Sequence, residues 1–366
     1  MLNQSSPNQS LRASLRTSCG CEPLGGRRRF VGGLGGLGAA MLASSCAIPS
    51  SGGVAAAERN RIDTHHHVFP PTYVTAAAKV NQAPPIVRNW SMTKTLDDMD
   101  AAGVATSIMS ITTPQLSFTD AASGPALARE CNEWTAKLNS QYKGRFGNFA
   151  VLPMHNMDVA LKELEYAMDV LKADGVGLLT SYEDKWLGHP FFIPLMKELN
   201  RRKAICYTHP TAAACCRNLQ PEVPTTVVEF GTDTTRTIVD LVFSGRAAEN
   251  PDIKFIFSHA GGTLPFLTER LIRMPMLDPK LAPRVPNGVL HELKKFYYDT
   301  AWTAHPYGLA SLLQLVGVPQ VLLGSDYPYR TGIDNVNGLN EYGGFNGADR
   351  QAIMRGNALR IIPRLA

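Results

Sequence analysis

The sequence alternates short apolar segments with amphipathic ones over most of its length, and this alternation is the strongest constraint on the fold. Successive β/α units are typical of a parallel sheet covered by helices. The predicted strands are Arg61–Thr64, Val104–Ile111, Phe146–Leu152, Val176–Thr180, Ala204–Thr208, Lys254–Ser258, Phe296–Asp299 and Val321–Gly324. The predicted helices are Ala121–Tyr142, Val159–Ala173, Phe191–Arg202, Thr232–Glu249, Leu264–Met274 and Pro306–Val316. Eight units over roughly 300 residues favour an α/β fold of the (β/α)8 TIM-barrel type over an open doubly wound sheet.

The connection between the first two strands is unusually long. It contains Pro70-Pro71 and Pro84-Pro85, and only Thr93–Ala102 has the pattern of a barrel helix. Residues from about 70 to 92 are therefore predicted to form a small insertion over the barrel mouth, as a lid would.

Metal-ligand residue types follow several of the predicted strands. Catalytic residues of such barrels lie at the C-terminal ends of the strands. His65 and His67 lie at the end of the first strand, His209 at the end of the fifth and Asp326 at the end of the eighth. Because side chains alternate along a strand, His65 and His67 point to one face and His66 to the other. Three imidazoles and one carboxylate, with room for water, are typical of a catalytic metal site.

The expected ion is one divalent metal, with Zn²⁺ favoured and Mn²⁺ as the alternative, because this donor set admits both. His259, which follows the sixth strand, is predicted to act next to the ligands as an acid or base.

A flat acidic substrate would need aromatic walls and a cation. Trp186, Trp302, Arg88 and Arg330 are the candidate substrate contacts, since they follow strands or lie in the insertion. Alternatively, each tryptophan packs against the protein without contacting substrate, and each arginine is a surface charge.

Five segments together resemble the amidohydrolase superfamily. They are Asp63-Thr64-His65-His66-His67, Tyr207-Thr208-His209-Pro210, Phe257-Ser258-His259-Ala260-Gly261-Gly262, Tyr298-Asp299-Thr300 and Gly324-Ser325-Asp326-Tyr327-Pro328. Within it they resemble the amidohydrolase-2 branch, typified by aminocarboxymuconate-semialdehyde decarboxylase. Asp184-Lys185-Trp186-Leu187-Gly188 and Asp233-Thr234-Thr235-Arg236-Thr237 are similar to the 6-methylsalicylate decarboxylase group of that branch.

The fourth strand refines this resemblance. Hydrolytic members with two metals place a carboxylated lysine there, whereas Gly175–Thr180 contains no lysine. The resemblance thus implies one metal, a carboxy-lyase acting on a small aromatic or unsaturated carboxylic acid, and a homodimer. Proton transfer would involve Asp326 and His259, or metal-bound water deprotonated by His259. A hydrolase of a lactone, ester or amide is the alternative enzyme, and an exported binding protein without catalysis is the third possibility.

The N-terminal 57 residues are predicted to be a targeting segment preceding a barrel over residues 58–366. Arg27-Arg28-Arg29-Phe30-Val31 followed by a mildly apolar stretch resembles a twin-arginine signal, which predicts export to the periplasm or beyond. A lipid-anchored Cys46 and an untargeted tail are the alternatives. Five arginines and one glutamate give this segment +4 of the net charge of +5. The near-neutral remainder argues against nucleic acid as a partner.

Overall fold

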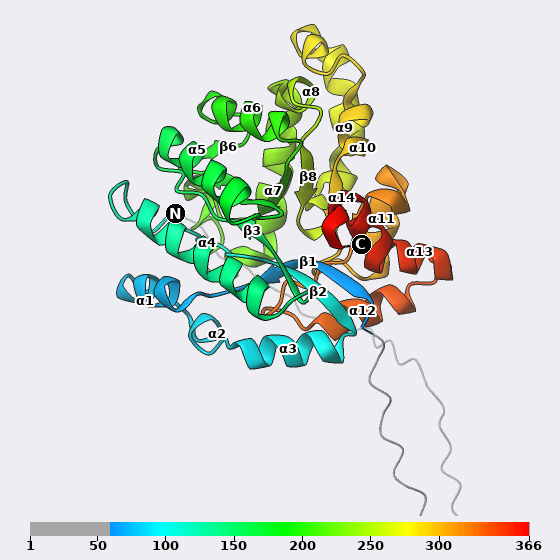
Figure 1. Ribbon diagram of the computed structural model, residues 1–366. Coiled ribbons are helices and arrows are strands. Elements are labelled where there is room, and N and C mark those ends of the chain that lie inside the picture. The colour runs from blue at the N-terminus through cyan, green and yellow to red at the C-terminus, as the bar shows by residue number, and fades with distance from the viewer. Residues whose placement is uncertain (1–58, 366) are drawn as a thin grey trace, which may run out of the picture. The chain divides into compact units, whose positions relative to one another are not determined.

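The computed structural model describes residues 59–365, which form eight parallel strands in a barrel surrounded by helices (Figure 1). The strands are β1 (Arg61–His67), β2 (Val104–Ser110), β3 (Phe146–Ala150), β4 (Gly175–Leu179), β7 (Ile205–His209), β8 (Lys254–Phe257), β9 (Tyr297–Asp299) and β10 (Val321–Leu322). They neighbour one another in chain order. The predicted TIM-type barrel is confirmed. The signal segment predicted for residues 1–57 lies outside the described residues.

The last strand closes the barrel against the first. The Thr64 amide donates to the Leu323 carbonyl at 2.9 Å, and the His67 amide donates to the Tyr327 carbonyl at 2.8 Å. These bonds place the segment after β10 directly beside β1. The end of β1 and Asp326 are therefore neighbours although they are far apart in the sequence.

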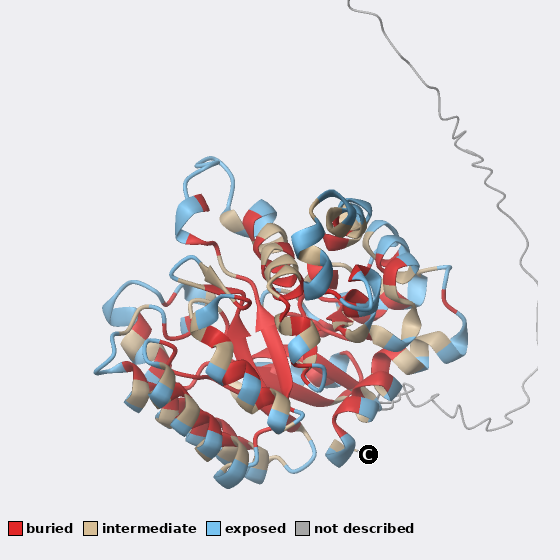
Figure 2. Cartoon of the chain, turned by 90° about the horizontal axis from the view of Figure 1, so that it is seen from above, coloured by how far each residue is buried: buried red, intermediate tan, exposed pale blue. Residues whose placement is uncertain are grey.

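The helices cover the outside of the barrel. They are α1 (Pro71–Lys79), α2 (Pro85–Arg88), α3 (Met92–Ala101), α4 (Gly124–Gln141), α5 (Met157–Glu165), α6 (Ile193–Arg201), α7 (Thr225–Phe243), α8 (Arg246–Glu249), α9 (Leu264–Leu277), α10 (Val289–Lys295), α11 (Pro306–Val316), α12 (Gly332–Glu341), α13 (Gly347–Gln351) and α14 (Asn357–Ile361). Figure 2 shows the strands buried at the centre and the exposed helix faces outside. Among residues 59–365 no helix is both long enough and apolar enough to cross a membrane.

Several helical segments differ from the sequence prediction, among them α10, α12 and α13, which are not among the predicted helices. The helix expected at Thr232–Glu249 begins at Thr225 and is divided into α7 and α8, because Gly245 adopts φ +84°, which ends an α-helix. The predicted insertion contains the short helices α1 and α2, each with a proline in its first turn, where the missing N–H costs nothing. A small hairpin of β5 (Ser181–Tyr182) and β6 (Lys185–Trp186) follows β4 and was not predicted.

Candidate metal centre and its cavity

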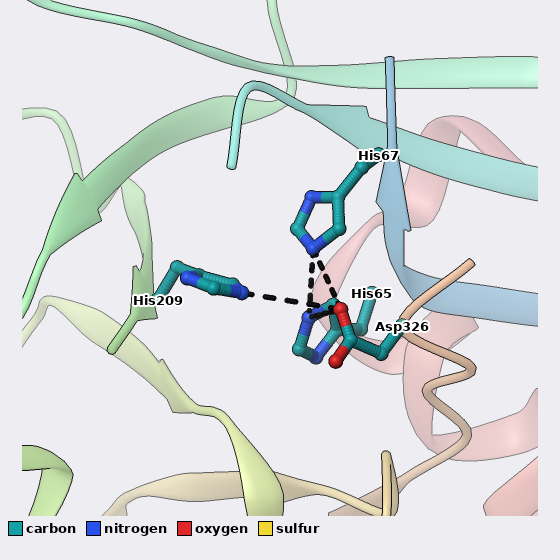
Figure 3. A group of neighbouring side chains, drawn as sticks. All are labelled: His65, His67, His209 and Asp326. Atoms are coloured by element: carbon teal, nitrogen blue, oxygen red, sulfur yellow. Dashed lines mark hydrogen bonds and ion pairs between the residues drawn. The ribbon is translucent and has the colours of Figure 1, made fainter. Parts of the chain in front are cut away.

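Four buried side chains converge at the mouth of the barrel (Figure 3). They are the predicted ligands His65, His67, His209 and Asp326, and one ligand atom from each lies within 4.8 Å of the others. Oδ1 of Asp326 lies 2.8 Å from His67 Nε2, 3.2 Å from His65 Nε2 and 3.9 Å from His209 Nε2. The structure thus brings together residues from β1, β7 and the segment after β10.

The three imidazoles are oriented by oxygen atoms behind them. Nδ1 of His65 lies 2.8 Å from Asp299 Oδ2, Nδ1 of His209 lies 2.9 Å from the Pro210 carbonyl, and Nδ1 of His67 lies 3.4 Å from the Ser110 carbonyl. Each Nδ1–H therefore donates outward, and each Nε2 faces the cluster. Metal-binding histidines are oriented in this way, so these residues fit a divalent ion.

Burial and charge perturb the pKa values of the cluster. Burial opposes protonation of His65, but the charges of Asp299 and Asp326 outweigh it and raise the pKa of His65 to about 10. Burial lowers the pKa of His67 to about 3 and also lowers that of His209. Burial disfavours ionisation of Asp326, yet the charge of the neighbouring His65, with His209 and His259 also close by, holds the pKa of Asp326 well below its usual value. These shifts favour a protonated His65 beside an ionised Asp326.

Three residues of the site have left-handed backbone conformations. His259, Trp302 and Asp326 have φ values of +54°, +57° and +66°. Non-glycine residues rarely adopt such values, which occur often at functional sites. These three residues lie two, three and four residues after the ends of β8, β9 and β10. The His259 and Trp302 side chains meet the carboxylate of Asp326 there.

His259 and Trp302 contact the second oxygen of Asp326. Nε2 of His259 lies 3.4 Å from Oδ2, and the Trp302 indole Nε1 donates a hydrogen bond to Oδ2 at 2.7 Å. The main-chain amide of His259 donates to Asp299 at 3.0 Å, which ties the His259 loop to the same carboxylate that orients His65. The His259 ring is therefore held next to Asp326.

A cavity of about 870 Å³ opens over this group. Its walls include His209, His259 and Asp326, with apolar surface from Val227, Phe230 and Trp302. Within the part of the chain that the structure describes, no lysine or arginine lines this cavity. A mostly apolar pocket with polar groups at one end suits a flat organic acid whose charged group points at the cluster.

Residues 62–364 match the family model described as Amidohydrolase. The chain belongs to the amidohydrolase family. It is 37% identical over 328 residues to "Decarboxylase yanB" of Aspergillus niger, covering 83% of this chain and 88% of that one. It is 34% identical over 274 residues to "6-methylsalicylic acid decarboxylase" of Penicillium expansum, covering 73% and 85%.

The fold is also that of a solved dihydroxybenzoic acid decarboxylase from Polaromonas. The TM-score is 0.74 at 21% identity, covering 83% of this chain and 97% of that one, and that protein was crystallised with manganese and the inhibitor 2-nitroresorcinol. The resemblance inferred from the sequence motifs is thereby confirmed at the level of the family and its decarboxylase branch.

The four candidate substrate contacts of this amidohydrolase have different surroundings. Trp302 lines the cavity, and the Arg330 guanidinium lies 5.7 Å from the centre of the Trp302 ring. Trp186 instead donates to Asp233 at 2.7 Å and lies beside α7, outside the cavity lining. Arg88 is exposed on α2 and is also outside the lining. The structure therefore brings only Trp302 into direct contact with the cluster.

The middle histidine of the triplet faces away from the cluster, as strand alternation predicted. His66 stacks on Tyr327 with ring centroids 4.8 Å apart, and its Nδ1 lies 3.1 Å from Asp63 Oδ2. Asp63 also accepts hydrogen bonds from the amides of His65 and Ser325, both at 3.0 Å. Asp63 therefore fixes the β1 end to the loop that carries Asp326.

Two functional positions were not assigned from the sequence. Asp299 ends β9 and accepts a hydrogen bond from His65. Its position as an acidic residue at the end of a barrel strand could have indicated this role from the sequence. Phe230 packs edge-on to His209, with ring centroids 6.1 Å apart. It was missed because the helix carrying it was expected to begin only at Thr232.

Proposed function

We propose that this protein is a metal-dependent, non-oxidative decarboxylase of a small aromatic carboxylic acid resembling 6-methylsalicylate. The observation that carries the proposal is the extended similarity to named decarboxylases, combined with the converged donor set. Among residues 59–365 no lysine or arginine lines the cavity. This favours a monocarboxylate, because a second carboxylate there would be buried without a cation.

His65, His67, His209 and Asp326 would hold the ion, and its positive charge would supply attraction for the substrate carboxylate and a neighbouring oxygen. Trp302, Phe230 and Val227 would orient the ring. The substrate carbon that bears the carboxylate would then lie close to Asp326 Oδ2 and His259 Nε2.

The reaction requires one proton and releases CO₂. A C–H bond forms at the carbon bearing the carboxylate, and the ring loses its conjugation for that step. The C–C bond then breaks, its electron pair returns to the ring, and CO₂ leaves. His259 Nε2 and Asp326 Oδ2, 3.4 Å apart, would pass this proton from solvent to the carbon.

The test is a CO₂-release assay on 6-methylsalicylate, with metal content measured on the same protein. We expect the wild-type protein to release CO₂ and cresol in equal amounts. His209→Ala should lose both this activity and metal binding. Turnover of lactones or esters without CO₂ release from any aromatic acid would instead favour the hydrolase reaction.

We propose Zn²⁺ as the ion, since three imidazoles and a carboxylate suit zinc, with Mn²⁺ as the alternative. Elemental analysis of protein purified without added metal, followed by reconstitution of the metal-free protein with each ion, distinguishes the two.

We propose that residues 1–57 direct export by the twin-arginine route, on the basis of Arg27 and Arg28 and the apolar stretch that follows. Replacing both arginines by lysine should retain the protein in the cytoplasm. Cys46→Ala tests the alternative of a lipid anchor. If Cys46 carries the anchor, this variant should no longer associate with the membrane.

We propose a homodimer as the assembly, on the strength of the family resemblance. Light scattering coupled to size-exclusion chromatography of the protein gives the mass directly, and a monomer mass across the concentration range would contradict it.

A further inference from the structure

A second hollow adjoins the metal cavity. It has a volume of about 450 Å³, and Tyr73 on α1 and Val87 on α2 form part of its wall. We call it the insertion groove, since these two residues belong to the insertion between β1 and α3. Thr113, Phe230 and Tyr329 line both hollows and therefore form the boundary between them.

The two aromatic rings of this boundary lie against metal-cluster histidines. Phe230 packs edge-on to His209 at 6.1 Å between centroids, and Tyr329 packs edge-on to His67 at 5.9 Å. Thr113 is fixed by a hydrogen bond from its hydroxyl to Thr211 at 3.1 Å. A substrate whose carboxylate points at the cluster would therefore lie beside this boundary.

We propose that Phe230 sets the size limit for the alkyl substituent of the substrate ring, and that the natural substrate is an aromatic monocarboxylate with a short substituent. This inference rests on the proposed function. Phe230 is partly buried in the second turn of α7 and lines both the cavity and the insertion groove. With that ring removed, a longer alkyl chain would extend past the boundary into the insertion groove.

The experiment compares 6-methylsalicylate with 6-pentylsalicylate in wild-type protein and in Phe230→Ala. The ratio of kcat/KM for the pentyl over the methyl substrate should rise by about tenfold or more, since discrimination by one methylene alone is worth about that much. Phe230→Trp should lower turnover of both substrates by enlarging the boundary. Phe230→Leu, a smaller perturbation of the fold, should give an intermediate ratio.

Phe266→Ala is the matched control, because Phe266 lies on α9 with 87% of its surface exposed and lines neither hollow. It should leave the ratio unchanged. An unchanged ratio in both Phe230→Ala and Phe230→Leu, with wild-type metal content, overturns the proposal.

A binding measurement separates this inference from the decarboxylase proposal. The probes are 3-methyl-2-nitrophenol and 3-pentyl-2-nitrophenol, in which a nitro group replaces the carboxylate, so they cannot lose CO₂. Calorimetric dissociation constants should favour the methyl probe in wild-type protein, and the preference should weaken about tenfold in Phe230→Ala. If wild-type protein releases no CO₂ but the shift in binding occurs, the decarboxylase proposal fails while the size limit stands. An unchanged binding preference overturns the size limit whatever the reaction.

Discussion

The carboxylate of Asp326 contacts both Trp302 and His67. The Trp302 indole donates to Asp326 Oδ2 at 2.7 Å, while Asp326 Oδ1 lies 2.8 Å from His67 Nε2. Asp326 thus presents one oxygen to the ligand set and the other to the cavity. The indole fixes the carboxylate plane, and with it the distance from Oδ2 to His259.

Trp302→Phe removes this donor and keeps most of the ring surface. We expect kcat/KM to fall by about tenfold, in line with the loss of a hydrogen bond to a charged group. Because the hydrogen bond favours the ionised carboxylate, the acidic limb of the pH profile should also move to higher pH. Trp134→Phe, at a tryptophan that packs on Trp90, is the matched control. If activity falls but the acidic limb of the pH profile stays at the same pH, Trp302 has only a packing role.

Asp299→Asn tests the carboxylate behind His65. Asp299 is fully buried, and its Oδ2 accepts from His65 Nδ1 at 2.8 Å. Loss of such a partner weakens metal binding by about 10- to 100-fold. Competition with a chelator of known affinity measures the change, and Asp252→Asn, at an exposed aspartate, is the control. Wild-type affinity in Asp299→Asn would show that main-chain packing alone orients His65.

Metal binding should depend on pH through His65. The pKa of His65 is raised to about 10 in the metal-free protein, so below that pH the ring is protonated and must lose its proton before it can bind an ion. Affinity should therefore increase about tenfold per pH unit between about pH 6 and about pH 9. Calorimetry in buffers of different ionisation enthalpy reports the proton released. Binding without proton release at pH 7 would contradict this assignment.

Stability should depend on pH through Asp98, on the outside of the barrel. Burial raises the pKa of Asp98 to about 6 from 3.8, despite a hydrogen bond from the Gly332 amide to Oδ2 at 3.0 Å. Between these values the folded protein holds a proton that the unfolded chain releases, so stability falls as pH rises from about 4 to about 6. The loss should be on the order of 2 kcal/mol.

Asp98→Asn should remove most of this fall, and urea unfolding at about pH 4.5 and about pH 7 measures it. Asp97→Asn, at the neighbouring exposed carboxylate, is the matched control. The same pH dependence in wild type and Asp98→Asn would assign it to other groups.

The sequence by itself determined the barrel and which candidate metal ligands converge at its mouth. The apolar strand pattern located all eight strands, and parallel strands in a barrel bring their C-terminal ends to one mouth. Strand alternation further separated His65 and His67 from His66. These conclusions depended only on hydrophobic periodicity and residue type, both of which can be read from the local sequence.

Only the tertiary structure decided what surrounds the ligands. Trp186 and Trp302 both follow strands, yet one is bonded to Asp233 on α7 and the other to Asp326. The difference depends on the left-handed backbone of Trp302, which no periodic pattern reveals because it occurs at one residue in a loop. The contacts of Asp299 with His65 and of Phe230 with His209 likewise join segments distant in the chain. Their pairing is fixed by strand register and helix packing, and these become determined only when the barrel closes.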